Sequence, residues 1–83
     1  MYMVVCSDGT YYTGVTTDLI RRVAEHNGEA GVGKGAKYTK PRRPVRLVYS
    51  EEVDNRSQAQ SRESIVRQLS RMEKHELAIS GKV

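Results

Sequence analysis

The sequence predicts an α+β fold, in which a small three-stranded antiparallel sheet is flanked by helices in the order ββαβαα. Two β-branched, apolar runs at residues 2–6 and 11–15 are separated by the turn sequence SDGT, which is typical of a β-hairpin. A third such run covers residues 45–52, and helix-capping patterns open three other segments. We find no internal repeat and no linker, so we expect one domain over residues 1–83.

The segment after the hairpin is predicted to form an amphipathic helix. Thr17 is expected to cap this helix, with Asp18 in its first turn, where the helix dipole favours a carboxylate. The pair Asn27-Gly28 is a common stop signal and should end the helix. The expected apolar stripe comprises Leu19, Ile20, Val23 and Ala24.

The second half of the chain is predicted to hold a loop, the third strand and two helices. Residues 28–44 are rich in glycine and basic side chains and end in two prolines, which favours a loop with room for one short helical turn. After the third strand, capping boxes that begin at Ser57 and Ser70 predict helices over about residues 58–69 and 71–79.

Composition narrows the class of protein. Of the 83 residues 37% are hydrophobic and 29% charged, which is typical of a globular rather than a disordered chain. No apolar run approaches the roughly 18 residues of a membrane span, and no signal-peptide pattern is present, so we expect a cytoplasmic protein without a membrane partner. The single cysteine, Cys6, excludes an internal disulfide and is expected to be a small buried residue.

The formal net charge is +4, and the basic residues are concentrated in residues 33–46, which contain no acid. This concentration favours a polyanionic partner, although a solvated loop without a partner has the same composition. The basic side chains of the stretch are Lys34, Lys37, Lys40, Arg42, Arg43 and Arg46.

Tyrosines, a glycine and a helix with an arginine and a histidine follow one another closely in the first third of the chain. Tyr2 lies in the first strand, Tyr12-Thr13-Gly14 in the second, Arg22 eight positions after this glycine, and His26 four after the arginine; Glu63 follows in a late helix. In the order and spacing of these residues the chain resembles the GIY-YIG nuclease superfamily, in particular its small single-domain bacterial members. The resemblance extends over nearly the whole chain.

The resemblance implies a bacterial metal-dependent endonuclease that hydrolyses phosphodiester bonds in DNA, with RNA as an alternative, in DNA repair or recombination. It implies one Mg²⁺ or Mn²⁺ ion bound by Glu63, and Arg22 as the cation that stabilises the phosphate. Tyr12 or Tyr2, together with His26, would activate water. The substrate would be branched, damaged or single-stranded, and a homodimer or a partner protein would supply specificity, since the chain has no residues left for a targeting domain.

The hairpin register decides whether both tyrosines can share a site. In a two-residue loop at Asp8-Gly9, Val5 faces Tyr12, and the two tyrosines lie on opposite faces of the sheet. In a three-residue loop with Gly9 left-handed, Val4 faces Tyr12, and the tyrosines share one face. If both are functional, we predict the three-residue loop; if neither is, two half-buried strand tyrosines are the alternative.

The chemistry of these side chains is consistent with the implied roles. Tyrosine is a poor base at its ordinary pKa of about 10, but a neighbouring cation lowers that pKa. Arg22 and His26 share a helix face, and Arg22 lies at the edge of the apolar stripe, which suits an arginine held partly in a cleft. The alternative for His26 is a surface residue near the helix end, where it favours the dipole.

Glu63 is informative from its position alone. It lies on the seam that Ala59, Val66 and Leu69 form along their helix. A carboxylate there is costly to bury unless it is paired or binds an ion, and a hard Mg²⁺ ion with mostly water ligands would suit it. A salt bridge to Arg22 or to a lysine is the alternative.

The residues expected to contact nucleic acid lie at the glycine, on the first helix and in the basic stretch. The glycine would allow a phosphate to approach the backbone, and the cations would hold phosphates without reading sequence. They are Gly14, Arg21, Lys34, Lys37, Tyr38, Lys40, Arg42 and Arg43.

Two other functions are kept as alternatives. The first is an accessory module of the same fold that binds nucleic acid but cuts weakly or not at all. The second is a small basic protein that binds other proteins. Affinity for nucleic acid that weakens steeply with added salt separates the first from the second.

Overall fold

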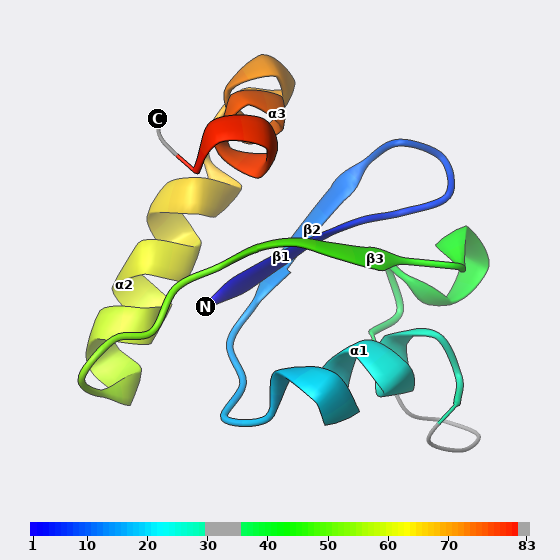
Figure 1. The fold of residues 1–83 in the computed structure, drawn as a ribbon, viewed down its shortest axis with the longest axis horizontal. Helices are drawn as coiled ribbons and strands as arrows, with labels where there is room; N and C mark the ends of the chain where they lie inside the picture. Colours follow the sequence, from blue (N-terminus) through cyan, green and yellow to red (C-terminus); the bar gives the residue numbers. More distant parts are fainter. Residues whose placement is uncertain (30–35, 82–83) are drawn as a thin grey trace.

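The computed structural model describes residues 1–29 and 36–81, which form the predicted α+β fold (Figure 1). Three strands make one antiparallel sheet in the order β2-β1-β3, so the N-terminal strand is central. The strands are β1 (Tyr2–Val5), β2 (Tyr11–Gly14) and β3 (Arg46–Ser50), each slightly shorter than predicted. The helices are α1 (Leu19–His26), α2 (Arg56–Arg67) and α3 (Arg71–Ser80), and a short 3₁₀ turn (Lys40–Arg42) precedes β3.

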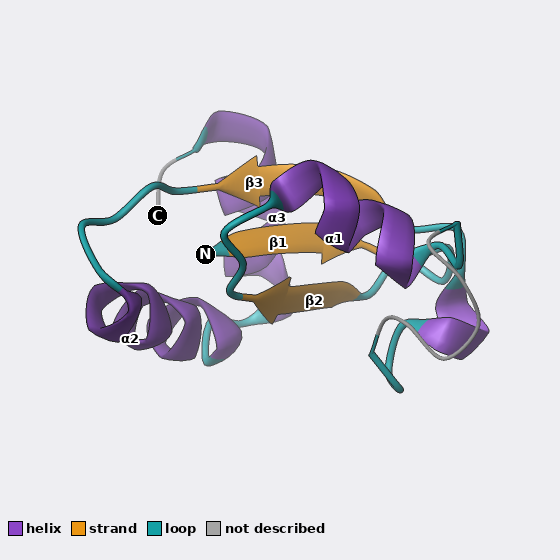
Figure 2. Ribbon diagram, turned by 90° about the horizontal axis from the view of Figure 1, so that it is seen from below, coloured by secondary structure: helices purple, strands orange, loops and turns teal. Residues whose placement is uncertain are grey.

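Helices lie on both faces of the sheet (Figure 2). Helix α1 packs on one face and α3 on the other, while α2 contacts the β2 edge. Because alternate side chains of β1 point to opposite faces, the sheet has two buried clusters. The cluster on the α1 side comprises Tyr2, Val4, Cys6 and Val45, and the opposite cluster comprises Met1, Met3, Val66 and Leu77. No helix in the described ranges is long and apolar enough to cross a bilayer.

The start of α1 differs from the prediction. Asp18, rather than Thr17, is the N-cap, and its carboxylate accepts a hydrogen bond of 3.1 Å from the backbone N–H of Arg21. Including Ile20 in the apolar stripe was also wrong, because its side chain is 87% exposed. Leu19 and Val23 pack against the sheet, and Ile20 lies about 100° further round the helix.

The start of α2 is also corrected. Asn55 is the N-cap and its side chain accepts a hydrogen bond of 2.9 Å from the backbone N–H of Gln58, so the capping box predicted at Ser57 does not form. Asparagine caps a helix as well as serine does, and α2 therefore begins at Arg56. The second predicted capping box, Ser70 with Glu73, is confirmed at the start of α3.

The hairpin between β1 and β2 has the three-residue loop. Val4 pairs with Tyr12 and Tyr2 with Gly14, so these four residues share one face of the sheet. The loop closes with a hydrogen bond of 2.9 Å from the Gly9 N–H to the Cys6 carbonyl, and Gly9 has a φ of 83°, which requires a glycine. Both tyrosines therefore face α1.

Candidate active site

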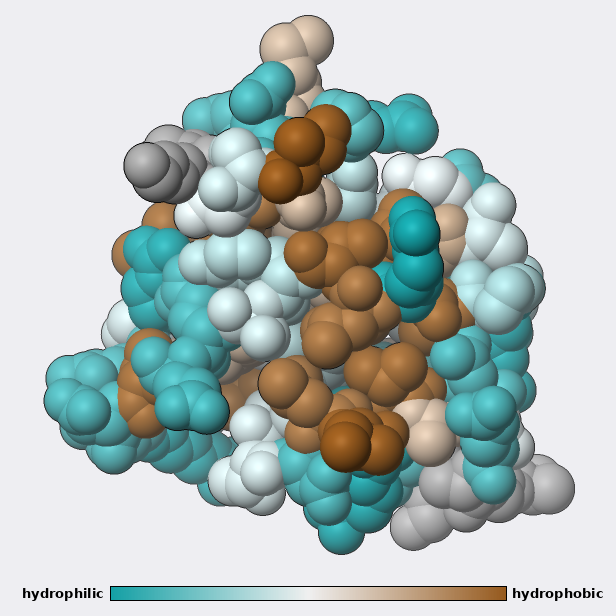
Figure 3. Space-filling view, in the orientation of Figure 1, coloured by the Kyte–Doolittle hydropathy of each residue, from teal (hydrophilic) through white to brown (hydrophobic). Residues whose placement is uncertain are grey.

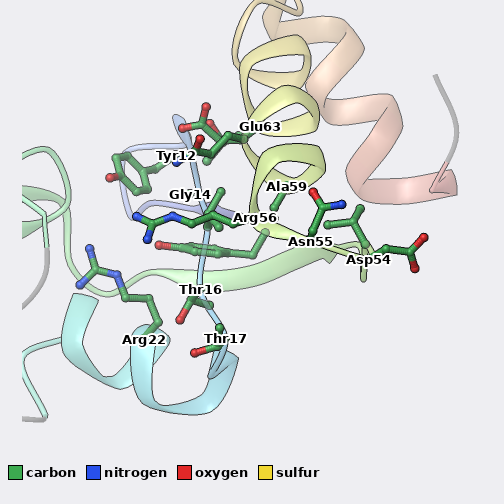
Figure 4. Close-up of a pocket in the computed structure, with 15 residues that line it drawn as sticks. Tyr12, Gly14, Thr16, Thr17, Arg22, Asp54, Asn55, Arg56, Ala59 and Glu63 are labelled. Carbon is green, nitrogen blue, oxygen red and sulfur yellow. The ribbon is translucent and has the colours of Figure 1, made fainter.

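A cleft of about 870 Å³ lies between the end of β2, the start of α1 and the first turns of α2 (Figure 4). It brings together five of the predicted site residues from four different elements. These are Tyr2, Tyr12, Gly14, Arg22 and Glu63. Residues distant in sequence therefore meet in one concave site, which is the arrangement expected of an active site.

His26 stands behind this cleft, in a buried chain of hydrogen bonds. Its side chain is fully buried, with Nε2 2.7 Å from the Tyr2 hydroxyl and Nδ1 2.8 Å from Oγ1 of Thr39. The one hydroxyl hydrogen of Thr39 is donated to the Ala36 carbonyl at 3.1 Å. Nδ1 must therefore carry the imidazole proton, and the Tyr2 hydroxyl donates to Nε2.

Burial sets the charge states of this pair. Desolvation, with the nearby Arg22 and Arg43 cations, lowers the pKa of His26 to about 4, so its imidazole is neutral at pH 7. Desolvation also raises the pKa of Tyr2, although the Arg22 guanidinium acts in the opposite direction. The expectation that a nearby cation lowers the pKa of Tyr2 was therefore wrong, because burial outweighs it.

Tyr12 lies in an aromatic group at the edge of the cleft. Its ring meets the His26 ring edge-on, with centroids 5.2 Å apart, and stacks on Tyr38 at 6.0 Å. The Arg42 guanidinium in turn lies 4.0 Å from the centre of the Tyr38 ring. The Tyr12 hydroxyl makes no hydrogen bond to another described residue, which leaves it for water or substrate.

Gly14 makes room for Tyr2. A Cβ atom at this position would lie 2.6 Å from the Tyr2 hydroxyl oxygen and 2.7 Å from its Cζ, which is closer than real Cβ atoms come. The close approach expected at this glycine is therefore made by a tyrosine ring. Gly14 also lines the cleft, so its contact with nucleic acid stays a prediction.

Arg22 reaches the cleft from α1. Its Nη1 lies 3.0 Å from Oε1 of Glu25, and its side chain is 28% exposed. This partial burial is what its place at the edge of the apolar stripe predicted. The neighbouring Arg21 points away: its side chain is 65% exposed, and its Nε lies 4.0 Å from the other oxygen of Glu25.

Glu63 lines the opposite wall of the cleft from α2 (Figure 4). Its side chain is 14% exposed and forms an ion pair with Arg67, one helical turn further on, rather than with Arg22 or a lysine. No three Asp, Glu, His or Cys side chains of residues 1–29 and 36–81 are grouped closely enough to cage a metal. One carboxylate on an open cleft nevertheless fits Mg²⁺ or Mn²⁺, which keep several waters and use few protein ligands.

The predicted basic surface is only partly directed outward. Lys37 and Lys40 are exposed, whereas Arg42 is engaged with Tyr38 and with Asp8 Oδ2 at 3.0 Å. The Arg43 side chain turns inward, where its Nε donates a hydrogen bond of 2.5 Å to the His26 carbonyl at the end of α1. Lys34 lies outside the described residues.

Sequence reasoning missed three residues of the site. Thr39 holds the His26 ring, while Asn55 and Arg56 line the cleft at the start of α2. Placing the helix start at residue 58 left Arg56 outside the helix and away from the site. The Asn55 cap was the signal that could have corrected this.

A second groove lies on the α3 side of the sheet, where apolar side chains gather in the space-filling view (Figure 3). It is lined largely by apolar residues, among them Leu47, Val48, Met72 and Ile79. None of the five catalytic candidates reaches it, so the first cleft is the candidate active site.

Comparison with known proteins identifies the family. The model of the GIY-YIG catalytic domain matches residues 1–76. A UPF0213 protein of Halobacterium salinarum is 54% identical over 77 residues, which cover 93% of this chain and 95% of that protein. A UPF0213 protein of Streptococcus agalactiae is 49% identical over 74 residues, covering 89% and 80%.

A UPF0213 protein of Desulfotalea psychrophila is 52% identical over 77 residues, which cover 93% of this chain and 67% of that protein. Similar proteins thus occur in both archaea and bacteria, and no solved structure matches the chain. The matched region contains every residue of the cleft. The chain therefore belongs to the GIY-YIG catalytic domain family, the nuclease family that its motifs resemble.

Proposed function

We propose that the protein is an endonuclease that hydrolyses phosphodiester bonds in DNA with the help of one Mg²⁺ or Mn²⁺ ion. The observation that carries the proposal is the convergence of Arg22, Glu63 and two phenols in one cleft. Phosphodiester hydrolysis requires a cation on the phosphate, a group that orients or deprotonates water, and support for the leaving oxygen. The cleft has candidates for all three.

Arg22 is assigned to the phosphate. Its planar guanidinium carries two parallel donor groups that match two phosphate oxygens. The ion pair with Glu25 and the packing of α1 hold it at the cleft before substrate arrives. The charge that develops on the phosphate in the transition state then meets a cation that needs little rearrangement.

The two tyrosines are assigned different parts in handling water. Because the Tyr2 hydroxyl donates its hydrogen to His26, its oxygen lone pairs remain to accept a hydrogen bond from a water in the cleft. The raised pKa of Tyr2 and the lowered pKa of His26 make this pair suited to orient water rather than to take its proton near pH 7. Tyr12, whose hydroxyl is free of described partners, is assigned as the acceptor of that proton.

Glu63 is assigned as the ligand of the divalent ion. When bound there, the ion would supply charge for the phosphate and the leaving oxygen. The role of Glu63 is to hold one coordination position at the wall of the cleft, and its ion pair with Arg67 must open for it to do so. We place this activity in DNA repair or recombination, with RNA as an alternative substrate.

A second candidate is an accessory module that binds nucleic acid and cuts weakly. Two observations favour it: Tyr2 is held as a neutral phenol, and the Glu63 carboxylate is already neutralised by Arg67. Such a module would bind DNA with the salt dependence of phosphate contacts but release no cleaved product.

A cleavage assay distinguishes these candidates. Single-stranded, duplex and branched DNA, and RNA, are incubated with the protein and Mg²⁺ or Mn²⁺, with EDTA as the control. The variants Tyr12→Phe, Arg22→Ala and Glu63→Gln should each lose about 100-fold or more of the cleavage rate, the usual effect of removing one group that stabilises the transition state.

Three matched variants control for general damage. Tyr11→Phe lies on the neighbouring strand position, Arg21→Ala removes the adjacent cation on α1, and Glu76→Gln removes an exposed carboxylate of α3. These should cut at close to the wild-type rate. Metal-independent cleavage, or cleavage that survives in all three cleft variants, would contradict the proposal, and salt-sensitive binding without cleavage would favour the accessory module.

A further inference from the structure

We propose that Arg56 is a second phosphate-binding arginine, which holds the substrate strand from the wall opposite Arg22. The inference rests on the proposed nuclease function, because it takes a nucleic acid as the ligand. It adds a residue that the motifs of the sequence do not include, and it assigns that residue to binding rather than to the chemical step.

The position of Arg56 is fixed by the start of α2. Arg56 is the first residue of the helix, directly after the Asn55 cap, and it lines the same cleft as Arg22 and Glu63. Figure 4 shows its side chain extending from α2 across the cleft over Gly14, toward the side from which Arg22 rises. Two guanidinium groups from opposite walls thus enter one cleft.

The pairing of the described arginines sets Arg56 apart. Seven of the nine in residues 1–29 and 36–81 donate to a carboxylate or to a backbone carbonyl. Arg46 and Arg56 have no hydrogen bond or ion pair with any described residue. The nearest carboxylate in sequence, that of Asp54, points away from the cleft in Figure 4. Arg56 therefore brings an uncompensated positive charge into the cleft.

The local environment of Arg56 does not explain the choice of residue. A helix dipole has its positive end at the N-terminus, so the first turn favours acids and disfavours a cation. An arginine at this position gains no apparent stability, since no described acid pairs with it. Residues that break a local rule without a structural return are commonly found at functional sites.

A phosphodiester backbone is the ligand that this pair of cations fits. A guanidinium can donate two parallel hydrogen bonds to one phosphate, and two guanidinium groups on facing walls can hold one phosphate or two successive ones. These contacts fix the position of the strand and read no sequence. Arg56 would therefore raise affinity for single-stranded and duplex substrates alike.

Binding in the absence of a divalent ion tests the inference independently of cleavage. Fluorescence anisotropy of labelled single-stranded and duplex DNA oligonucleotides is measured in EDTA over a series of NaCl concentrations. The protein variants are Arg56→Gln and Arg46→Gln. Arg46 is the matched control, because it is also exposed and unpaired with described residues, and because it lines the apolar groove instead of the cleft.

For Arg56→Gln we expect affinity to fall several-fold, with a plot of log K against log salt that is less steep by about 0.7 to 0.9, the loss of one phosphate contact. Arg46→Gln should leave the slope unchanged. The thermal midpoint of Arg56→Gln should not fall, since the substitution removes no described contact and relieves the helix dipole.

The opposite outcomes overturn the inference in distinguishable ways. An unchanged slope for Arg56→Gln, or an equal change for Arg46→Gln, would show that Arg56 makes no phosphate contact of its own, while the proposed nuclease would stand. Absence of salt-dependent binding by the wild-type protein would overturn both the inference and the proposed function.

Discussion

The hydroxyl oxygen of Tyr2 lies 2.7 Å from Nε2 of His26, although the two residues are separated by 24 positions in the sequence. Tyr2 is the first residue of the central strand, and His26 the last residue of α1. One hydrogen bond therefore fixes the helix against the sheet and sets the orientation of a phenol that lines the cleft. Stability and the arrangement of the candidate site depend on the same contact.

Replacing His26 with alanine should destabilise the protein by about 2–4 kcal/mol, because it leaves a cavity and removes the partner of the buried Tyr2 hydroxyl. Urea unfolding monitored by circular dichroism would measure this loss. His75→Ala is the control: His75 is exposed, although its Nδ1 lies 3.0 Å from the Tyr11 hydroxyl, so a loss below about 1 kcal/mol is expected. Equal losses would contradict the structural role of His26.

The lowered pKa of His26 predicts a pH dependence of stability. The folded-state pKa is about 4, below the ordinary value of 6.5, so the unfolded chain binds the proton more readily. The contribution is present above pH 6.5 and is lost as the pH falls toward 4, with a total change of about 3 kcal/mol. The folding free energy of His26→Gln should be much flatter over this range.

This window is separate from that of the carboxylates. The side chain of Glu51 accepts hydrogen bonds from Arg62 and Tyr49, which hold its pKa at about 2, below the ordinary 4.5. Its stabilising contribution is therefore lost between about pH 4.5 and 2, below the range in which His26 titrates. A wild-type curve that is flat from pH 6.5 to 4.5 would contradict the burial of a neutral imidazole.

A methyl group at position 14 should displace the Tyr2 ring. A Cβ there would lie 2.6 Å from the phenol oxygen, so Gly14→Ala should cost about 1–3 kcal/mol and reduce cleavage. The clash is tested in a double-mutant cycle with Tyr2→Leu, in which the shorter side chain should make Gly14→Ala nearly neutral. Additive losses in urea unfolding would show that the glycine is needed for another reason.

The geometry of the hairpin could be predicted because a functional constraint limited the choice of register. A shift of one residue turns every side chain to the other face, so requiring Tyr2 and Tyr12 on one face selected the three-residue loop. The seam position of Glu63 followed from helical periodicity in the same way. Both predictions used strict local geometry, in which the alternatives differ by a whole face of a strand or helix.

Features that depend on tertiary packing could not be predicted. Sequence reasoning assumed that a cation would dominate the pKa of Tyr2, whereas the extent of its burial is known only once α1 is placed on the sheet. The helix starts failed for a different reason, since Asp18 and Asn55 compete with Thr17 and Ser57 as almost equally good caps. The second of these errors concealed Arg56.

The ion pair between Glu63 and Arg67 predicts that divalent metal binding is opposed by a neighbouring cation. Both side chains lie on α2, one turn apart, and Glu63 cannot ligate a metal with the oxygen that Arg67 holds. Arg67→Gln should therefore strengthen Mn²⁺ binding about two- to fivefold, because an ion pair of this exposure is worth up to about 1 kcal/mol. Calorimetric titration of Mn²⁺ into the protein without nucleic acid measures this effect directly. Arg71→Gln, which removes one positive charge from the start of α3, controls for the change in net charge and should leave the affinity unaltered. Glu63→Gln should abolish the binding heat in both backgrounds; binding that survives this substitution would place the metal elsewhere and remove Glu63 from the proposed mechanism.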